Sequence, residues 1–356
     1  MPDAPLTSPR PRVRVPAKDA IAKLVTDAGI SGNTGVAVLD LATGETLEAI
    51  GDTIPQPPAS VTKAFTALYA IEALAPEYTF DTGVYADGPI VDGILDGNLI
   101  LAGGGNPNLV TDDLAALAQT LKETGLIEVK GDFFVWDSAL TNLDEIDSAQ
   151  LDYLGYNPSV TGLNLNFNRV HFEWKLEGED YVTTMDARST NYRPAVTAAQ
   201  IKVDDRPSPV FTYDEVGDTD QWTVARGALN REGSRWLPVR HPAIYAGEVF
   251  ATFARSHGLV LKAPQETFAA PVGEPIAVHK SAPLYELMQG MLRFSTNITA
   301  EAAGLAASQA RSGQQRGLRT SAFGMARWAN GRCGGISPSF VDHSGLGDQS
   351  RVSPAD

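Results

Sequence analysis

The sequence predicts a mixed α and β protein of several domains. Three patterns carry this prediction: an apolar helix over residues 59–74, short alternating runs with Gly and Pro turns over 82–275, and helical spacing after Pro283. With 356 residues, the chain is long enough for two or three domains and an ample core. Its 43% hydrophobic and 20% charged residues are ordinary for a globular protein.

The N-terminal part predicts one short helix followed by a hairpin. Residues 17–28 have the apolar spacing of an amphipathic helix. Residues 34–41 form an apolar strand candidate, and residues 43–50 are its hairpin partner, joined through a turn that contains Gly44.

The strongest helix prediction covers residues 59–74. Apolar side chains recur at helical spacing, and Pro57 and Pro58 stand just before the helix, where proline is tolerated. Ser60 is therefore expected at or within the first turn.

The region from about residue 83 to 277 is expected to be β-rich, with one helix at 243–257. Within 163–174 the apolar alternation changes phase near Asn168, which predicts a bulge or a change of buried face. After Pro283 the pattern predicts three helices, at residues 284–294, 299–310 and 321–330.

Composition disfavours several classes of protein. The net charge is -15, whereas nucleic-acid binders usually carry a basic surface, so no nucleic-acid partner is expected. No run approaches the ~20 apolar residues that span a bilayer. Residues 1–16 lack the apolar core of a signal peptide, so the chain is cytosolic or its export signal is not part of this sequence.

The sequence predicts neither a metal nor an organic cofactor. The five histidines are scattered and form no His-Glu-x-x-His, and no dinucleotide or phosphate-loop motif is present. The single cysteine, Cys333, allows no internal disulfide. It lies in a Gly-rich turn without a helix start that would lower its pKa, so a cysteine hydrolase is disfavoured.

The candidate catalytic residues begin with Ser60-Val61-Thr62-Lys63. Positions i and i+3 share one face of a helix, so the Lys63 amine can reach the Ser60 hydroxyl. A serine needs a base to become a nucleophile, and a lysine serves only if its pKa falls well below its ordinary value. The same four-residue pattern also arises by chance about once in a chain of this size.

A second element, Ser295-Thr296-Asn297, lies between two predicted helices. Ser295 could relay a proton between Lys63 and a leaving group, and the Asn297 amide could hold a substrate carbonyl. Serine and asparagine are also good turn and cap residues, so a purely structural role is the alternative.

Together these elements resemble the penicillin-binding protein and serine β-lactamase superfamily. The likeness is greatest to the class C penicillin-binding proteins, or S13 peptidases, of the D-alanyl-D-alanine carboxypeptidase/endopeptidase type. It extends over roughly residues 34–354 and includes the Gly-rich turn at 103–107, the segment 281–292 before Ser-x-Asn, and the segment 342–354. Asn106 stands where Asp is more usual in the family, and His343 and Gly347 are milder departures.

The resemblance implies an α+β architecture with a β-lactamase/transpeptidase-like domain. An antiparallel sheet covered by helices would be built from residues 1–82 and 278–356, and residues 83–277 would form a β-rich insertion. Ser60 would attack peptidoglycan stem peptides through an acyl-enzyme that β-lactams also form, in the periplasm or cell envelope. Lys63 and Ser295 would be catalytic, and Asn297 would bind substrate. The oligomeric state stays open.

One departure leaves alternatives open. The family's third element, Lys-Thr-Gly, is not found up to Asp356, so the catalytic domain looks incomplete at its C-terminal end. If the sequence is nevertheless whole, a penicillin-binding fold that serves as a scaffold is the alternative. A β-lactamase or esterase on the same fold is the other, although the long insertion argues against it.

Overall fold

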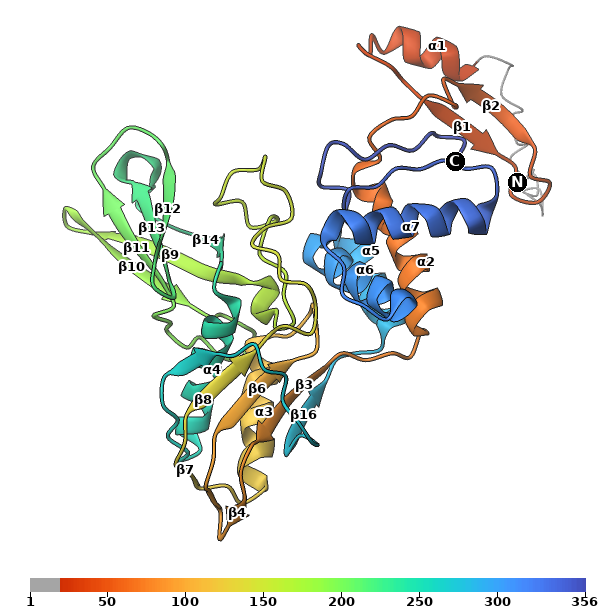
Figure 1. Cartoon of the computed structure of the whole chain (residues 1–356). Helices are drawn as coiled ribbons and strands as arrows, with labels where there is room; N and C mark the ends of the chain where they lie inside the picture. Colours follow the sequence, from red (N-terminus) through yellow and green to blue (C-terminus); the bar gives the residue numbers. More distant parts are fainter. Residues whose placement is uncertain (1–19) are drawn as a thin grey trace, which may run out of the picture. The chain divides into compact units, whose positions relative to one another are not determined.

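The computed structural model describes residues 20–356 (Figure 1). The chain divides into two compact units. The smaller unit contains the chain up to Pro57 together with Arg351–Asp356, and the larger unit is Pro58–Ser350. Helices and strands occur throughout, which confirms the mixed α+β class. The predicted boundaries at residues 82/83 and 277/278 stay a prediction.

The smaller unit consists of a helix and a hairpin. Helix α1 (Ala20–Asp27) is followed by the antiparallel strands β1 (Val36–Leu39) and β2 (Thr46–Ile50), as predicted. The Asp40 carboxylate fixes the turn by accepting hydrogen bonds from the N–H groups of Ala42 and Thr43. Residues 17–19 of the predicted helix lie outside the described residues.

Four helices of the larger unit pack around one apolar core. They are α2 (Thr62–Leu74), α5 (Leu284–Phe294), α6 (Asn297–Ser312) and α7 (Leu318–Cys333). The three predicted C-terminal helices are thus confirmed, with α6 and α7 starting earlier and ending later. Cys333 is the last residue of α7 and not part of a turn as predicted, because helical hydrogen bonding extends to the Gly334 N–H, which donates to the Asn330 carbonyl oxygen.

Small residues on α6 allow close packing inside this helical layer. Ala300, Ala302 and Ala303 are fully buried. A Cβ atom at Gly304 would overlap the ring of His343, so only glycine permits this approach. His343 is itself fully buried, and its Nε2 lies 2.7 Å from the Ser321 hydroxyl.

A five-stranded mixed sheet follows α2 in the chain. Its order is β15 (Pro264–Glu266), β8 (Phe133–Trp136), β6 (Leu99–Gly103), β3 (Asp81–Ala86) and β16 (Ala277–Lys280). Every residue of β6 is buried, as its apolar sequence requires at the centre of a sheet.

Two helices pack against this sheet, whereas the sequence predicted one. Helix α4 (Pro242–Ser256) matches the prediction for 243–257, but α3 (Thr111–Glu123) was missed. The sequence does contain a helical pattern here, because Leu114, Leu117 and Leu121 have helical spacing, and all three are buried in the structure. Asp113 caps the helix by accepting a hydrogen bond from the Val110 N–H.

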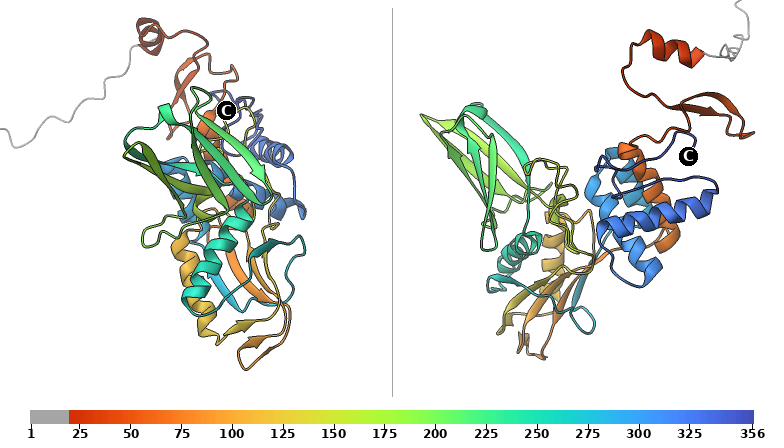
Figure 2. Two further views of the ribbon diagram at one scale, coloured as in Figure 1. Left: turned by 90° about the vertical axis from the view of Figure 1, so that its left-hand side faces the viewer. Right: turned by 45° about the horizontal axis from the view of Figure 1, so that its top comes forward.

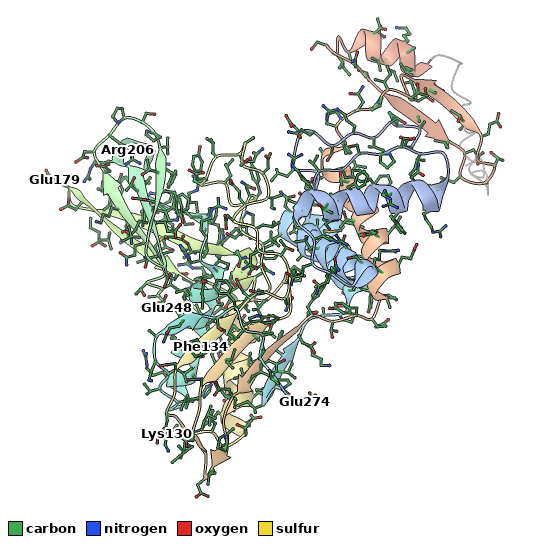
Figure 3. The ribbon with its side chains drawn as sticks, in the orientation of Figure 1. Lys130, Phe134, Glu179, Arg206, Glu248 and Glu274 are labelled. Atoms are coloured by element: carbon green, nitrogen blue, oxygen red, sulfur yellow. The ribbon has the colours of Figure 1, made fainter. Side chains whose placement is uncertain are left out.

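The remaining strands form three smaller sheets (Figure 2). Their orders are β10 (Asp180–Asp186), β9 (Arg169–Glu177), β14 (Glu232–Pro238); β11 (Ala199–Asp204), β13 (Thr219–Ala225), β12 (Phe211–Val216); and β4 (Ile90–Val91), β5 (Ile94–Leu95), β7 (Glu128–Val129). Glu248 of α4, labelled in Figure 3, accepts hydrogen bonds from the N–H groups of Thr197 and Ala198 just before β11. The Glu248 carboxylate of α4 thus fixes the start of β11.

The phase change near Asn168 marks a left-handed turn. Asn166, Phe167 and Asn168 have φ values of 51°, 61° and 50°, and β9 starts only at Arg169. The phase change is therefore a turn before the strand and not a bulge within it, because three consecutive left-handed residues cannot continue the pleat.

Candidate active site

Ser60 lies in a tight turn that leads into α2. Residues Ala59–Val61 form a 3₁₀ turn, and the α-helix proper begins at Thr62. Ala59 has a left-handed φ of 47°, which separates the turn from the prolines before it. Ser60 is exposed, whereas Lys63 one turn later is only 1% exposed. The turn thus presents a hydroxyl to solvent above a buried amine.

The Lys63 amine has three oxygen neighbours. Its Nζ lies 3.2 Å from Ser60 Oγ, 2.8 Å from Asn297 Oδ1 and 2.8 Å from the Ser344 carbonyl oxygen. A neutral amine can donate two hydrogen bonds to the two carbonyl oxygens, and its lone pair then faces the Ser60 hydroxyl. The geometry suits a base that takes a proton from Ser60.

Burial supports the neutral form of this amine. Desolvation lowers the pKa of Lys63 from its ordinary value of 10.5, although the charges of Glu301 and Asp342 oppose the shift. Because burial is the larger effect, the lysine loses its proton more readily than a lysine in water.

The Ser-x-Asn segment reaches the same place from the junction between α5 and α6. Ser295 ends α5 in the left-handed region, with φ 56° and ψ 40°, and its hydroxyl lies 2.8 Å from Ser60 Oγ. Asn297 is the first residue of α6, and its Nδ2 donates a 2.8 Å hydrogen bond to the Tyr156 carbonyl oxygen. The structure therefore brings the four predicted site residues, Ser60, Lys63, Ser295 and Asn297, into one cluster.

A buried carboxyl group that the sequence pattern did not reveal lies behind this cluster and supports it. Glu301 is fully buried and accepts hydrogen bonds from the N–H groups of His343 (3.0 Å) and Ser344 (2.8 Å). It thereby fixes the backbone of Ser344, whose carbonyl oxygen accepts a hydrogen bond from Lys63. Its position one helical turn after Asn297 was the available signal, because i and i+4 share a face.

A second carboxylate shapes the same segment. Asp342 accepts hydrogen bonds from the N–H groups of Gly345 and Gly347, each 2.6 Å long. Gly345 has a φ of 75°, and a Cβ atom there would overlap the carbonyl oxygen of Ala59. Only glycine therefore fits at position 345, where this segment passes the turn that contains Ser60.

Two further observations concern membrane and metal. None of the helices within residues 20–356 is long and apolar enough to cross a bilayer. In the same part of the chain, no group of three or more His, Cys, Asp or Glu side chains is placed to hold a metal ion.

The helices and sheets described above form a transpeptidase-like α+β fold. The crystal structure of penicillin binding protein 4 (dacB) from Haemophilus influenzae superposes with a TM-score of 0.76 at 22% identity, over 94% of this chain and 75% of that one. The same protein complexed with a novel beta-lactam gives a TM-score of 0.75 at 21% identity, with the same coverage of both chains. At these identities the likeness concerns the fold.

The chain belongs to the D-Ala-D-Ala carboxypeptidase 3 (S13) family, whose model matches residues 17–355. A D-alanyl-D-alanine carboxypeptidase of an Actinomadura species is 27% identical over 314 residues, which cover 80% of this chain and 56% of the relative. D-alanyl-D-alanine carboxypeptidase DacB of Haemophilus influenzae is 26% identical over 264 residues, which cover 68% of this chain and 52% of the relative. The chain thus spans about half the length of these curated relatives.

Proposed function

We propose that this protein is a serine D-alanyl-D-alanine carboxypeptidase that acts on peptidoglycan stem peptides through an acyl-enzyme on Ser60. The single observation that carries the proposal is the short contact chain of Lys63 Nζ, Ser60 Oγ and Ser295 Oγ, with distances of 3.2 and 2.8 Å. Family membership and the names of the relatives support the choice of substrate.

The proposed reaction has two halves. Ser60 Oγ attacks the carbonyl carbon of the penultimate D-alanine while Lys63 Nζ takes the hydroxyl proton. The tetrahedral intermediate collapses, the amide C–N bond breaks, and the leaving amine of the terminal D-alanine receives a proton through Ser295. Water then hydrolyses the Ser60 ester, which releases the shortened peptide and restores the hydroxyl.

Asn297 is proposed to bind the substrate backbone. Its Oδ1 accepts from Lys63, while its Nδ2 donates to the Tyr156 carbonyl oxygen. A substrate carbonyl that replaced the Tyr156 oxygen would receive the same amide hydrogen and would lie beside the lysine. The site therefore has a donor for a peptide close to the attacking hydroxyl.

Two wider features belong to the proposal. We expect β-lactams to acylate Ser60, since their strained amide offers the same carbonyl chemistry to the nucleophile. We also expect cleavage of cross-linked peptides, where the leaving amine belongs to another stem, and action in the cell envelope. Both follow from the family resemblance.

Release of D-alanine tests the assignment. The purified protein is incubated with a peptide that ends in D-Ala-D-Ala, and free D-alanine is measured over time. We expect release by the wild type and none by the Ser60→Ala variant, with a Ser234→Ala variant as a matched control, because Ser234 is an exposed serine of β14 and is not part of the Ser60 cluster. Equal release by wild type and Ser60→Ala would contradict the proposal. Rapid hydrolysis of a chromogenic cephalosporin without D-alanine release would favour a β-lactamase.

A further inference from the structure

A small cavity of about 200 Å³ lies at the start of α3, outside the Ser60 cluster. Its walls include the aromatic side chains of Phe167 and Trp236 and the charged side chains of Asp112, Arg169 and Arg188. Drug-sized ligands usually occupy at least ~300 Å³, so this cavity suits a smaller molecule.

Arg169 is a largely buried cation in this wall. Its guanidinium carbon lies 5.1 Å from the centre of the Phe167 ring and 5.5 Å from that of Trp236. Its Nε is buried without a hydrogen-bond partner, and no carboxylate of the described residues lies within 4.0 Å of the guanidinium. Burial lowers the pKa of Arg169. A desolvated cation without a counter-charge is costly unless a ligand supplies one.

The left-handed turn at residues 166–168 places this arginine beside α3. The Asn166 side chain accepts a hydrogen bond from the Thr111 N–H (3.2 Å) and donates one to the Thr111 hydroxyl (2.9 Å). The turn is therefore attached to the first residue of the helix, and β9 begins with Arg169 directly after it. This attachment holds the Arg169 backbone and the ring of Phe167 at the cavity.

Asp112 contributes the opposite charge to the same cavity. Its Oδ1 accepts hydrogen bonds from the Ser189 hydroxyl (2.9 Å) and the Asn191 N–H (3.3 Å), and it has no ion-pair partner among residues 20–356. The other arginine, Arg188, is already paired with two carboxylates, those of Asp186 and Glu173. The cavity thus presents one cation and one carboxylate that are not neutralised.

We propose that this cavity binds a free α-amino acid with a short side chain. The amino-acid carboxylate would pair with Arg169, and its ammonium group would pair with Asp112. A zwitterion neutralises both charges at once, whereas a simple anion would leave Asp112 facing it. The aromatic walls leave room for a small apolar side chain. The proposal does not depend on the chemistry at Ser60.

The test is calorimetric titration with D-alanine and with L-alanine, in the Ser60→Ala variant so that no acyl-enzyme forms. We expect at least one of the two to bind, and Arg169→Met to weaken binding by about tenfold or more, because a charged hydrogen-bonded pair is lost. Acetate and methylamine, which each carry only one of the two charges, should bind more weakly than the amino acid.

Arg235 provides a matched control for the arginine substitution. Like Arg169, it stacks on two aromatic rings, 5.0 Å from Tyr153 and 4.7 Å from Phe211, and its Nε is buried without a partner. It is not part of this cavity. Arg235→Met should therefore leave amino-acid binding unchanged, although it removes a similar stacked cation.

Three results would overturn the proposal. One is that neither amino acid binds, the second is that Arg169→Met binds as tightly as its parent, and the third is that acetate binds as tightly as alanine. If Arg169→Met does not fold, as judged by near-ultraviolet circular dichroism, the same titration is carried out with Asp112→Asn. It retains the hydrogen-bonding oxygen but removes the charge, so unchanged binding would also contradict the proposal.

Discussion

Lys63 Nζ lies 2.8 Å from the Oδ1 atom of Asn297, although 234 positions separate the two residues in the sequence. The contact joins the start of α2 to the start of α6. It brings the two motifs of the sequence argument together and orients the buried amine toward Ser60. The reactivity of Ser60 should therefore depend on the charge of Lys63 and on the α5–α6 junction.

The rate of Ser60 acylation should rise with pH. Burial lowers the pKa of Lys63 below 10.5, and only the deprotonated amine can accept the Ser60 proton. Rates of labelling by a fluorescent penicillin, measured across pH, should reach half of their maximum below pH 10.5. Lys63→Arg keeps the positive charge but cannot deprotonate, so the rate should fall about 10²–10⁴-fold. A flat pH profile, or an unchanged rate in Lys63→Arg, would exclude Lys63 as the base.

Substitutions of Ser295 should separate stability from reactivity. Ser295 has a φ of 56°, where an L residue is strained and glycine is not. The free energy of unfolding, measured by denaturant titration, should be about 1 kcal/mol higher for Ser295→Gly than for Ser295→Ala. Both variants lose the hydroxyl 2.8 Å from Ser60, so both should acylate and release D-alanine more slowly. Full activity of Ser295→Gly would show that the hydroxyl is not needed.

Gly345→Ala should disable the site. The new Cβ would overlap the Ala59 carbonyl oxygen, directly before Ser60, in addition to the strain of a positive φ. Gly313→Ala is the matched control, since Gly313 has a similar φ of 69° and no neighbouring atom within 4 Å of the added carbon. We expect Gly313→Ala to lose only about 1 kcal/mol of stability and to keep its penicillin labelling. Equal labelling of the two variants would contradict the close approach.

The grouping of the four candidate residues could be predicted better than the elements around them. Ser60 and Lys63 could be paired because helical spacing alone brings i and i+3 together. Their proximity to Ser295 is a tertiary contact that no local spacing predicts, and only the polar residue types at 295–297 and the family resemblance suggest it. The role of the Ser344 carbonyl could not be predicted, because every residue type has the same backbone carbonyl group.

The missed elements have physical causes. Helix α3 differs from the expected β region because its residues mix polar and apolar types as an alternating strand does, although its apolar spacing is helical. The change of phase before β9 was noticed, but three successive left-handed residues are too rare to expect from sequence. The roles of Glu301 and Asp342 depend on backbone N–H groups that only the fold brings to them.

Glu301 should make the stability of the protein depend on pH. Burial and the nearby charge of Asp342 raise the pKa of Glu301 from 4.5 to about 8. The folded state therefore binds this proton more tightly than the unfolded state, so the Glu301 contribution to the free energy of unfolding falls as pH rises from about 4.5 to about 8.

Glu301→Gln should remove this part of the pH dependence. Its amide can accept from only one of the N–H groups of His343 and Ser344, so the variant should also lose about 1–3 kcal/mol at pH 6. Denaturant titrations of wild type and variant between pH 5 and 8 measure both effects. Parallel stability curves for the two proteins would contradict the raised pKa.

The residue that a β-lactam acylates decides whether Ser60 is the nucleophile. The purified protein is labelled with a fluorescent penicillin and digested, and the modified peptide is sequenced by mass spectrometry. We expect a label on Ser60, no label in Ser60→Ala, and normal labelling in the exposed-serine control Ser234→Ala. A label on any other residue, or undiminished labelling of Ser60→Ala, would contradict this expectation.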